Sequence, residues 1–203
     1  FRGHAYSRAG VAAFTTSTGY GIAKYDNPEE LSVSDRNNIG YQYTDCPLYW
    51  ISVIYLNFAE AKAEMGSLTQ DDLNNSINKL QARAGLPAMT TTPDADPANN
   101  MGVSNLIWEI RRCRRCELIM DNWYRYWDLI RWHQLDKLDS TKYPNTMLGA
   151  NVSNVPDCEE ATKNGYIDAS DAQIRTYEAK HYFYPIPTTQ LTLNKNMKQN
   201  PGW

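Results

Sequence analysis

Two neighbouring stretches with helical periodicity and clear end signals constrain the fold of this chain most strongly. The first, residues 48–65, is apolar on nearly all sides, which predicts burial on several sides, and Gly66 is expected to end it. The second is predicted as one helix, with Thr69 as N-cap, an acidic capping-box partner three residues on, and Gly85 as the C-terminal glycine. The short turn makes the helices antiparallel neighbours. Residues 48–86 are therefore predicted to form a tetratricopeptide-type helical hairpin.

The remaining residues divide into four segments of different character. These are a loop-rich entry over residues 1–47, a helical segment over 104–135, variable loops over 136–180 and a C-terminal segment over 181–203. The helical segment is predicted as one helix from about Ser104 to Asp121 and an aromatic helix from Trp123 to Leu135, and a last short helix is expected from about Thr188. The fold class is mostly α, with further helices and long irregular loops. Because a lone hairpin of this type leaves apolar surface uncovered, we expect partner helices from elsewhere in the parent protein.

Composition excludes several classes of protein. The chain has 203 residues, of which 42% are apolar and 21% charged, which is typical of a globular protein. Its net charge of −3 provides no basic excess for a phosphate backbone, so no nucleic-acid partner is expected. No stretch approaches the ~18 consecutive apolar residues of a membrane span. The chain opens without a signal peptide, which we expect to belong to the parent protein.

The four cysteines do not predict a metal or redox site. Cys113 and Cys116 have zinc-ligand spacing, but they lie in a charged helical run without a second ligand pair. Two small core-facing side chains one helical turn apart are the favoured interpretation. A disulfide between Cys46 and Cys158 remains open from sequence alone.

No arrangement of residues predicts catalysis. The three histidines, His4, His133 and His181, are far apart in unrelated contexts, and the carboxylate clusters are explained by solvated loops and helix N-termini. No glycine loop carries the residues that cradle a phosphate. The sequence therefore predicts neither an enzyme nor a cofactor.

Charged residues around the aromatic helix are predicted to form structural ion pairs. The arginines of the run 111–115 spread around the helix, so they do not form one anion-binding patch. Residues three apart on a helix share a face and can pair. The expected participants are Arg115, Glu117, Arg125, Asp128 and Arg131. Arg114 and Asp121 remain alternatives as partners within the same segment.

Tyrosine and tryptophan are abundant, with 14 Tyr and 6 Trp. Flat aromatic faces bind sugar C–H groups, so aromatic residues on loops are the candidates for a ligand site. These candidates are Tyr6, Tyr20, Tyr41, Tyr43 and Tyr49. The tryptophans within predicted helices, Trp108, Trp123, Trp127 and Trp132, are interpreted instead as core residues.

Three segments, in this order and at these distances, together resemble one family. They are YLNFAEAKAEMG at Tyr55–Gly66, RRCRRCELIMDNWYRYWDLIRW at Arg111–Trp132, and YFYPIPTTQLTLNKNMKQNPGW at Tyr182–Trp203. The segment TGYGIAKYDNP at Thr18–Pro28 is a weaker match. The combination resembles the C-terminal part of a SusD-like (RagB/SusD) protein.

The sequence departs from the family pattern at several positions. An acidic residue is usual where Cys113 stands, and an arginine is frequent near Trp50. The pair Asp121-Asn122 replaces the usual Glu-Gly, with one extra residue before Arg125. This insertion predicts a helix break or bulge around Asp121 to Tyr124.

The resemblance implies a function and a location. Members of this family are lipid-anchored on the outer face of the outer membrane in Bacteroidetes, where they serve polysaccharide utilisation. They partner a SusC-like TonB-dependent transporter and capture glycans or peptides without catalysis. The resemblance further implies that the N-terminal half of the parent protein, with its lipidated cysteine, precedes this segment. A tetratricopeptide-type protein-interaction module is the first alternative, and a carbohydrate-active enzyme is the second.

Overall fold

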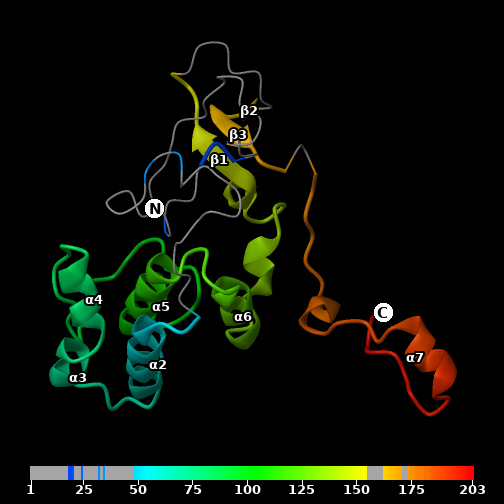
Figure 1. Ribbon diagram of the computed structural model, residues 1–203, viewed down its shortest axis with the longest axis horizontal. Coiled ribbons are helices and arrows are strands. Elements are labelled where there is room, and N and C mark those ends of the chain that lie inside the picture. The colour runs from blue at the N-terminus through cyan, green and yellow to red at the C-terminus, as the bar shows by residue number, and fades with distance from the viewer. Residues whose placement is uncertain are drawn as a thin grey trace. The chain divides into compact units, whose positions relative to one another are not determined.

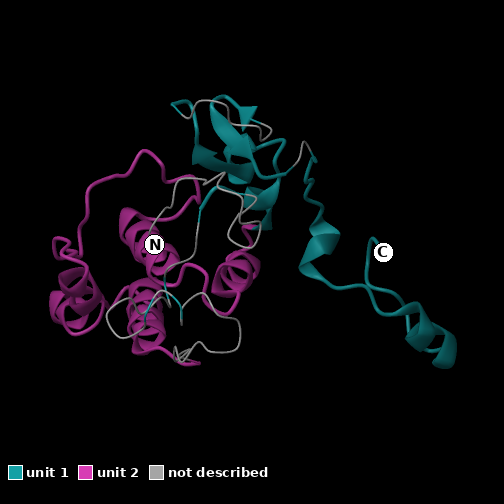
Figure 2. Ribbon diagram, turned by 45° about the horizontal axis from the view of Figure 1, so that its top comes forward, with its two compact units in different colours: residues 1–46, 135–203 teal, residues 47–134 magenta. Residues whose placement is uncertain are grey.

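The structure, a computed structural model, describes residues 18–20, 24, 32, 34, 48–154, 162–170 and 173–203. The chain divides into two compact units (Figures 1 and 2). Residues 47–134 form one, here called the helical unit, and residues 1–46 together with 135–203 form the other, the loop unit. The fold is mostly α, as predicted. None of the described helices is long and apolar enough to cross a membrane.

The first helix of the hairpin, α2, runs over Ile51–Glu64 and ends as the sequence predicts. Gly66 adopts a left-handed φ of +66°. The N–H of Gly66 donates to the Ala63 carbonyl at 3.0 Å, and the N–H of Ser67 donates to the Lys62 carbonyl at 2.9 Å. These two bonds make a Schellman motif, which satisfies the last carbonyls of the helix.

The second arm of the hairpin consists of two short helices, α3 over Gln70–Asn74 and α4 over Ile77–Arg83. The predicted capping box is present, because the Thr69 hydroxyl accepts from the Asp72 N–H at 3.1 Å and the Asp72 carboxylate accepts from the Thr69 N–H at 2.9 Å. The prediction of one continuous helix was wrong. Ser76 leaves the helical conformation, and its hydroxyl donates to the Asp72 carbonyl at 2.6 Å. Serine competes in this way with the helical hydrogen bonds.

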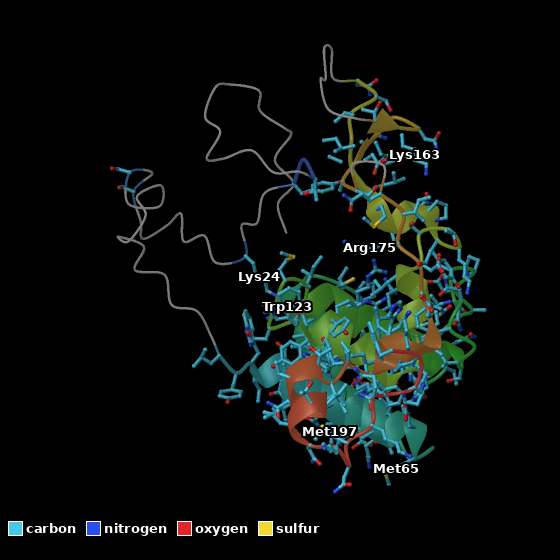
Figure 3. The ribbon with its side chains drawn as sticks, turned by 90° about the vertical axis from the view of Figure 1, so that its right-hand side faces the viewer. Lys24, Met65, Trp123, Lys163, Arg175 and Met197 are labelled. Atoms are coloured by element: carbon cyan, nitrogen blue, oxygen red, sulfur yellow. The ribbon has the colours of Figure 1, made fainter. Side chains whose placement is uncertain are left out.

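The predicted helix break around Asp121 to Tyr124 is confirmed. Helix α5 covers Asn105–Glu117 and is capped by the Ser104 hydroxyl, while α6 covers Tyr124–Arg131. Between the two helices the chain takes positive φ values at three residues, Met120, Asn122 and Trp123. A left-handed backbone reverses the helical path, which accommodates the extra residue. Trp123, labelled in Figure 3, lies at this break and is 78% exposed.

The core of the helical unit joins the hairpin to α5, because α2 packs against both α4 and α5 (Figure 1). Its buried members are Leu56, Ala59, Leu73, Ile77, Leu80, Met89, Ile110 and Leu118. The expectation that α2 is buried on several sides is corrected by the structure. Ile51, Ile54 and Phe58 share one face of α2, and all three are exposed. We call these three residues the apolar face of α2.

The loop unit contains a small sheet where the sequence had indicated only loops. It has three antiparallel strands in the order β1-β3-β2. Their bounds are Leu148–Asn151 for β1, Thr162–Lys163 for β2 and Tyr166–Asp168 for β3. Asn164 and Gly165 both have positive φ values, so they form the type I′ turn that favours a tight hairpin. An Asn-Gly pair is a strong hairpin signal that our interpretation had overlooked.

Short helical turns and a close backbone approach complete the loop unit. The helical elements described in its residues 135–203 are η2 over Leu135–Leu138, η3 over Pro144–Met147, η4 over Ala179–Tyr182 and α7 over Thr188–Leu193. Helix α7 begins at the predicted residue. The Ala150 N–H donates to the Thr18 carbonyl at 2.8 Å, and a Cβ at Gly149 would collide with that carbonyl. Glycine is therefore required at position 149 for Thr18 to lie beside β1.

Candidate functional site

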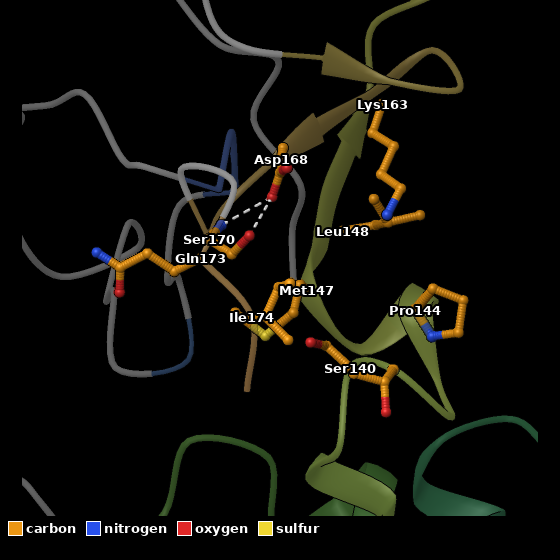
Figure 4. Close-up of a pocket in the computed structure, with 10 residues that line it drawn as sticks. Ser140, Pro144, Met147, Leu148, Lys163, Asp168, Ser170, Gln173 and Ile174 are labelled. Carbon is orange, nitrogen blue, oxygen red and sulfur yellow. Dashed lines mark hydrogen bonds between the residues drawn. The ribbon is translucent and has the colours of Figure 1, made fainter. Parts of the chain in front are cut away.

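The loop unit contains a cavity of about 450 Å³, here called the loop pocket (Figure 4). Its polar lining comprises Ser140, Thr141, Lys163, Asp168, Ser170 and Gln173. Its apolar lining comprises Pro144, Met147, Leu148 and Ile174. A volume of this size lies within the usual range for sites that bind small molecules.

The three strands of the sheet contribute residues to the lining of the loop pocket. Asp168 ends β3, and its carboxylate accepts hydrogen bonds from the Ser170 N–H at 3.0 Å and the Ser170 hydroxyl at 2.5 Å (Figure 4). Lys163 ends β2, immediately before the Asn-Gly turn. The tight turn therefore fixes where the lysine and the carboxylate lie along the strands.

A buried aspartate, Asp139, immediately precedes the pocket residues Ser140 and Thr141. Its carboxylate accepts from the Thr141 N–H at 2.9 Å and from the Tyr177 N–H at 3.1 Å. The hydrogen bond from the Thr141 hydroxyl, followed by these backbone N–H groups, lowers the pKa of Asp139 to about 2. The Ser140 N–H donates to the Arg175 carbonyl at 2.9 Å, and the Ser140 hydroxyl accepts from the Arg175 N–H at 3.0 Å. Side-chain bonds to the backbone thus bring distant loop segments together.

The chemistry of the loop pocket suits hydrogen bonding of a polar ligand. Hydroxyl, amide and ammonium groups can donate, the hydroxyls and the amide can accept, and apolar side chains can contact a carbon skeleton. Its titratable residues are Lys163 and Asp168, and the Asp168 carboxylate already binds Ser170. No group of three potential metal ligands occurs among the residues that the structure describes.

The two described members of the predicted ligand-binding set, Tyr20 and Tyr49, do not line the loop pocket. Tyr6, Tyr41 and Tyr43 lie outside the described residues. Tyr20 belongs to the loop unit and Tyr49, which is exposed, belongs to the helical unit. Neither tyrosine lines the pocket. The aromatic ligand site stays a prediction, because three of its five tyrosines are not described.

The helical unit contains a network of ion pairs centred on two carboxylates. Asp128 is 4% exposed, and its two oxygens accept from Nε of Arg114 at 2.7 Å and from Nε of Arg131 at 2.9 Å. The second of these pairs was expected, and Arg114 was an open alternative for the first. Because Arg114 belongs to α5 and Asp128 to α6, their pair joins the two helices, while Arg131 binds Asp128 within α6.

Glu60 of α2 is the second centre, which the sequence interpretation missed. Its carboxylate accepts from Arg131 at 2.5 Å, from the Trp132 indole N–H at 2.6 Å and from Arg111 at 3.3 Å. Arg111 also pairs with Glu64 at 3.0 Å. Glu60 is buried, so these donors satisfy a charge that would otherwise be costly to bury.

Other predicted ion pairs differ from expectation. Glu117 pairs with Arg83 at 2.5 Å and accepts from the Ser52 hydroxyl at 2.7 Å, rather than pairing with Arg115. Within the described part of the chain, neither Arg115 nor Arg125 forms an ion pair. Burial, followed by the charge of Arg115, lowers the pKa of Arg125 to about 10, and the charge of Asp128 partly opposes this.

The cysteines that the structure describes are free. Cys113 packs against the core, and burial raises the pKa of its thiol to about 12, whereas Cys116 is exposed. Cys46 and Cys158 lie outside the described residues, so the disulfide between them stays an open question.

Comparison of the chain with known proteins identifies its family. The model of the SusD family matches residues 4–203. Among solved structures, the chain is similar to a SusD-like protein from Bacteroides fragilis, with 25% identity and a TM-score of 0.48. This match covers 75% of the present chain and 25% of the solved one, so the present chain spans about a quarter of that protein's length. No curated protein matches.

Proposed function

Because the chain belongs to the SusD family, whose model matches residues 4–203, we propose that it is a non-catalytic component of an outer-membrane nutrient-uptake system. The match over almost the entire chain is the observation that carries this proposal. Membership suggests a nutrient- or glycan-binding protein, and the family is generally one of binding proteins rather than enzymes.

A glycan or peptide is the proposed ligand, and the loop pocket is its proposed site. The pocket supports this choice because it surrounds a small cavity with hydroxyl, amide and ammonium groups beside apolar side chains. Such groups bind the hydroxyls of a sugar or the amides of a peptide.

A SusC-like TonB-dependent transporter is the proposed partner. Family membership supports a lipid-anchored position on the outer face of the outer membrane, where such a transporter operates. The apolar face of α2 is the proposed contact with the N-terminal half of the parent protein, because Ile51, Ile54 and Phe58 are exposed on one side of the helix.

Affinity electrophoresis tests the proposed function. The chain would be run in gels that contain starch, dextran, xylan or mannan, and reducing ends would be measured in the same mixtures. We expect at least one polysaccharide to retard the chain without release of new reducing ends. Retardation should weaken in Gln173→Ala, which removes an amide from the loop pocket, and should persist in Gln190→Ala, a matched exposed glutamine of α7.

Two outcomes would contradict the proposal. Release of reducing ends would favour a carbohydrate-active enzyme. Absence of retardation by the polysaccharides, together with specific retention of a protein by the apolar face of α2, would favour a tetratricopeptide-type interaction module. The exposure of Ile51, Ile54 and Phe58 is the observation that favours this second candidate.

A further inference from the structure

An open groove of about 470 Å³ lies within the helical unit, between α2 and α6, and is distinct from the loop pocket. Trp127 and Tyr124 of α6 contribute its aromatic surface. Asn57 and Glu64 of α2, with Arg131 of α6, contribute polar groups that reach its rim. Every lining residue belongs to one compact unit, so the groove is a feature of that unit alone.

Trp127 presents an apolar surface without a covering partner. Its side chain is 53% exposed, although its position in an amphipathic helix had indicated the core. The ring of Tyr126 lies edge-on to it, with 5.5 Å between ring centroids, and this contact limits rotation of the indole. A large aromatic face held at the surface beside polar groups is the feature with which proteins stack sugar rings.

The polar groups of the groove are already held in position. Arg114 donates from Nη1 to the Asn57 side-chain oxygen at 2.8 Å, which leaves the amide NH₂ of Asn57 as a donor. Glu64 is exposed, and one of its oxygens binds Arg111 at 3.0 Å. Arg131 is anchored through both Asp128 and Glu60. A ligand would therefore meet donors and acceptors that lose little conformational freedom on binding.

We propose that this groove is a second saccharide-binding site, with Trp127 as the stacking surface and Asn57, Glu64 and Arg131 as hydrogen-bonding groups. The proposal rests on the proposed function, because it assumes that the nutrient is a glycan. The lining holds three carboxylates, Glu60, Glu64 and Asp128, and two guanidinium groups, Arg114 and Arg131. Each of these groups is already paired with an opposite charge, which favours a neutral sugar over a charged ligand. Sugar hydroxyls both donate and accept, so they satisfy these groups at once.

A covering apolar helix fits the groove less well than a sugar does. It would remove water from Glu64 and Arg131 without supplying polar partners, which is unfavourable. The apolar face of α2, by contrast, offers Ile51 and Ile54, and neither of these lines the groove. The two surfaces therefore differ in chemistry and suit different occupants.

The test compares two exposed tryptophans at α6 in the full 203-residue chain. Its probe is a polysaccharide from the panel of starch, dextran, xylan and mannan that retards the wild-type chain. Trp127→Ala should weaken the affinity about tenfold or more, because the stacking surface is lost. Trp127→Tyr should restore part of it. Trp123→Ala is the matched control, since Trp123 is even more exposed but lines no part of the groove, and it should bind as the wild type does.

A spectroscopic measurement keeps the test independent of the stability of the alanine variant. The chain would be labelled with 5-fluorotryptophan, the Trp127 signal assigned with Trp127→Tyr, and fluorine spectra recorded with and without the polysaccharide. A shift of the Trp127 signal, with the Trp123 signal unchanged, is expected. If the polysaccharide retards the chain but leaves the Trp127 signal and the Trp127→Ala affinity unchanged, the groove is not a saccharide site, while the proposed function stands. If no polysaccharide of the panel binds, the saccharide site is overturned, and so is a glycan as the ligand of the proposed function.

Discussion

The helical unit buries a continuous apolar core, whereas the described part of the loop unit has only a small buried cluster, Ala150, Val152 and Ile167. Side-chain bonds to the backbone hold much of the loop unit instead. The Asp139 carboxylate accepts a hydrogen bond from the Tyr177 N–H. Gln199 forms two hydrogen bonds with the backbone of Ile186, at 2.8 and 2.9 Å. The comparison indicates that global stability resides in the helical unit, while the loop unit is organised by local polar contacts that also shape a pocket.

The largest effect is expected from Asp128→Ala. Removal of this buried carboxylate leaves Arg114 and Arg131 without their shared partner, which should reduce the free energy of unfolding by about 3–5 kcal/mol. The free energy of unfolding is measured by urea denaturation, with far-UV circular dichroism as the signal. Glu109→Gln, in an exposed pair with Arg112 one turn away, is the control and should cost only about 0.5 kcal/mol or less. Equal losses in the two variants would mean that burial does not distinguish these pairs.

The next largest loss of stability is expected from Leu56→Ala, which truncates a core side chain. Leu56 is fully buried in the main cluster, so the change should lower the free energy of unfolding by about 2–5 kcal/mol. Ile54→Ala on the same helix is the matched control. Ile54 is 60% exposed, so this change should stay within about 0.5 kcal/mol. A large loss in Ile54→Ala would show that the apolar face of α2 is covered in solution.

Acid should affect the loop unit through Asp139. Its folded pKa of about 2 lies below the ordinary 3.8, so the carboxylate stabilises the fold above pH 3.8. That contribution is lost as the pH falls from 3.8 towards 2. The protection factors of the Thr141 and Tyr177 amides, which compare each exchange rate with the intrinsic rate at the same pH, should therefore fall over this range. Asp139→Asn should exchange faster already at neutral pH, and an unchanged rate would contradict the assigned role.

The smallest effect concerns the thiols. Burial raises the pKa of Cys113 to about 12, so at neutral pH almost none of it is the reactive thiolate. Cys116 is exposed. Iodoacetamide should label Cys116 well before Cys113, as peptide mass spectrometry would show. Equal labelling rates in the native chain would place Cys113 outside the core.

Local signals predicted the helical unit well. Thr69, Gly66 and Gly85 marked where the helical arms of the hairpin begin and end. Such signals are readable because capping and left-handed glycines depend on a few neighbouring residues. The break before Tyr124 was also predictable, because one extra residue must leave the helical path.

Long-range contacts set the limits of that prediction. Glu60 meets Arg131 across 71 residues, and no local pattern indicates such a pair. The exposure of Trp127 depends on which helices lie near it, so its helical position alone was misleading. Ser140 and Asp168 both line the loop pocket, and sequence periodicity does not reveal that they lie near one another. Only its Asn164-Gly165 turn carried a readable local signal.

Backbone hydrogen exchange on the intact chain tests the contrast between the two units most directly. Amides of α2 and α5 should exchange about two orders of magnitude or more slowly than those of η3 and β1, because the former open only when the apolar core unfolds. Equal protection in the two units, or slower exchange in η3 and β1, would contradict the division of stability described above.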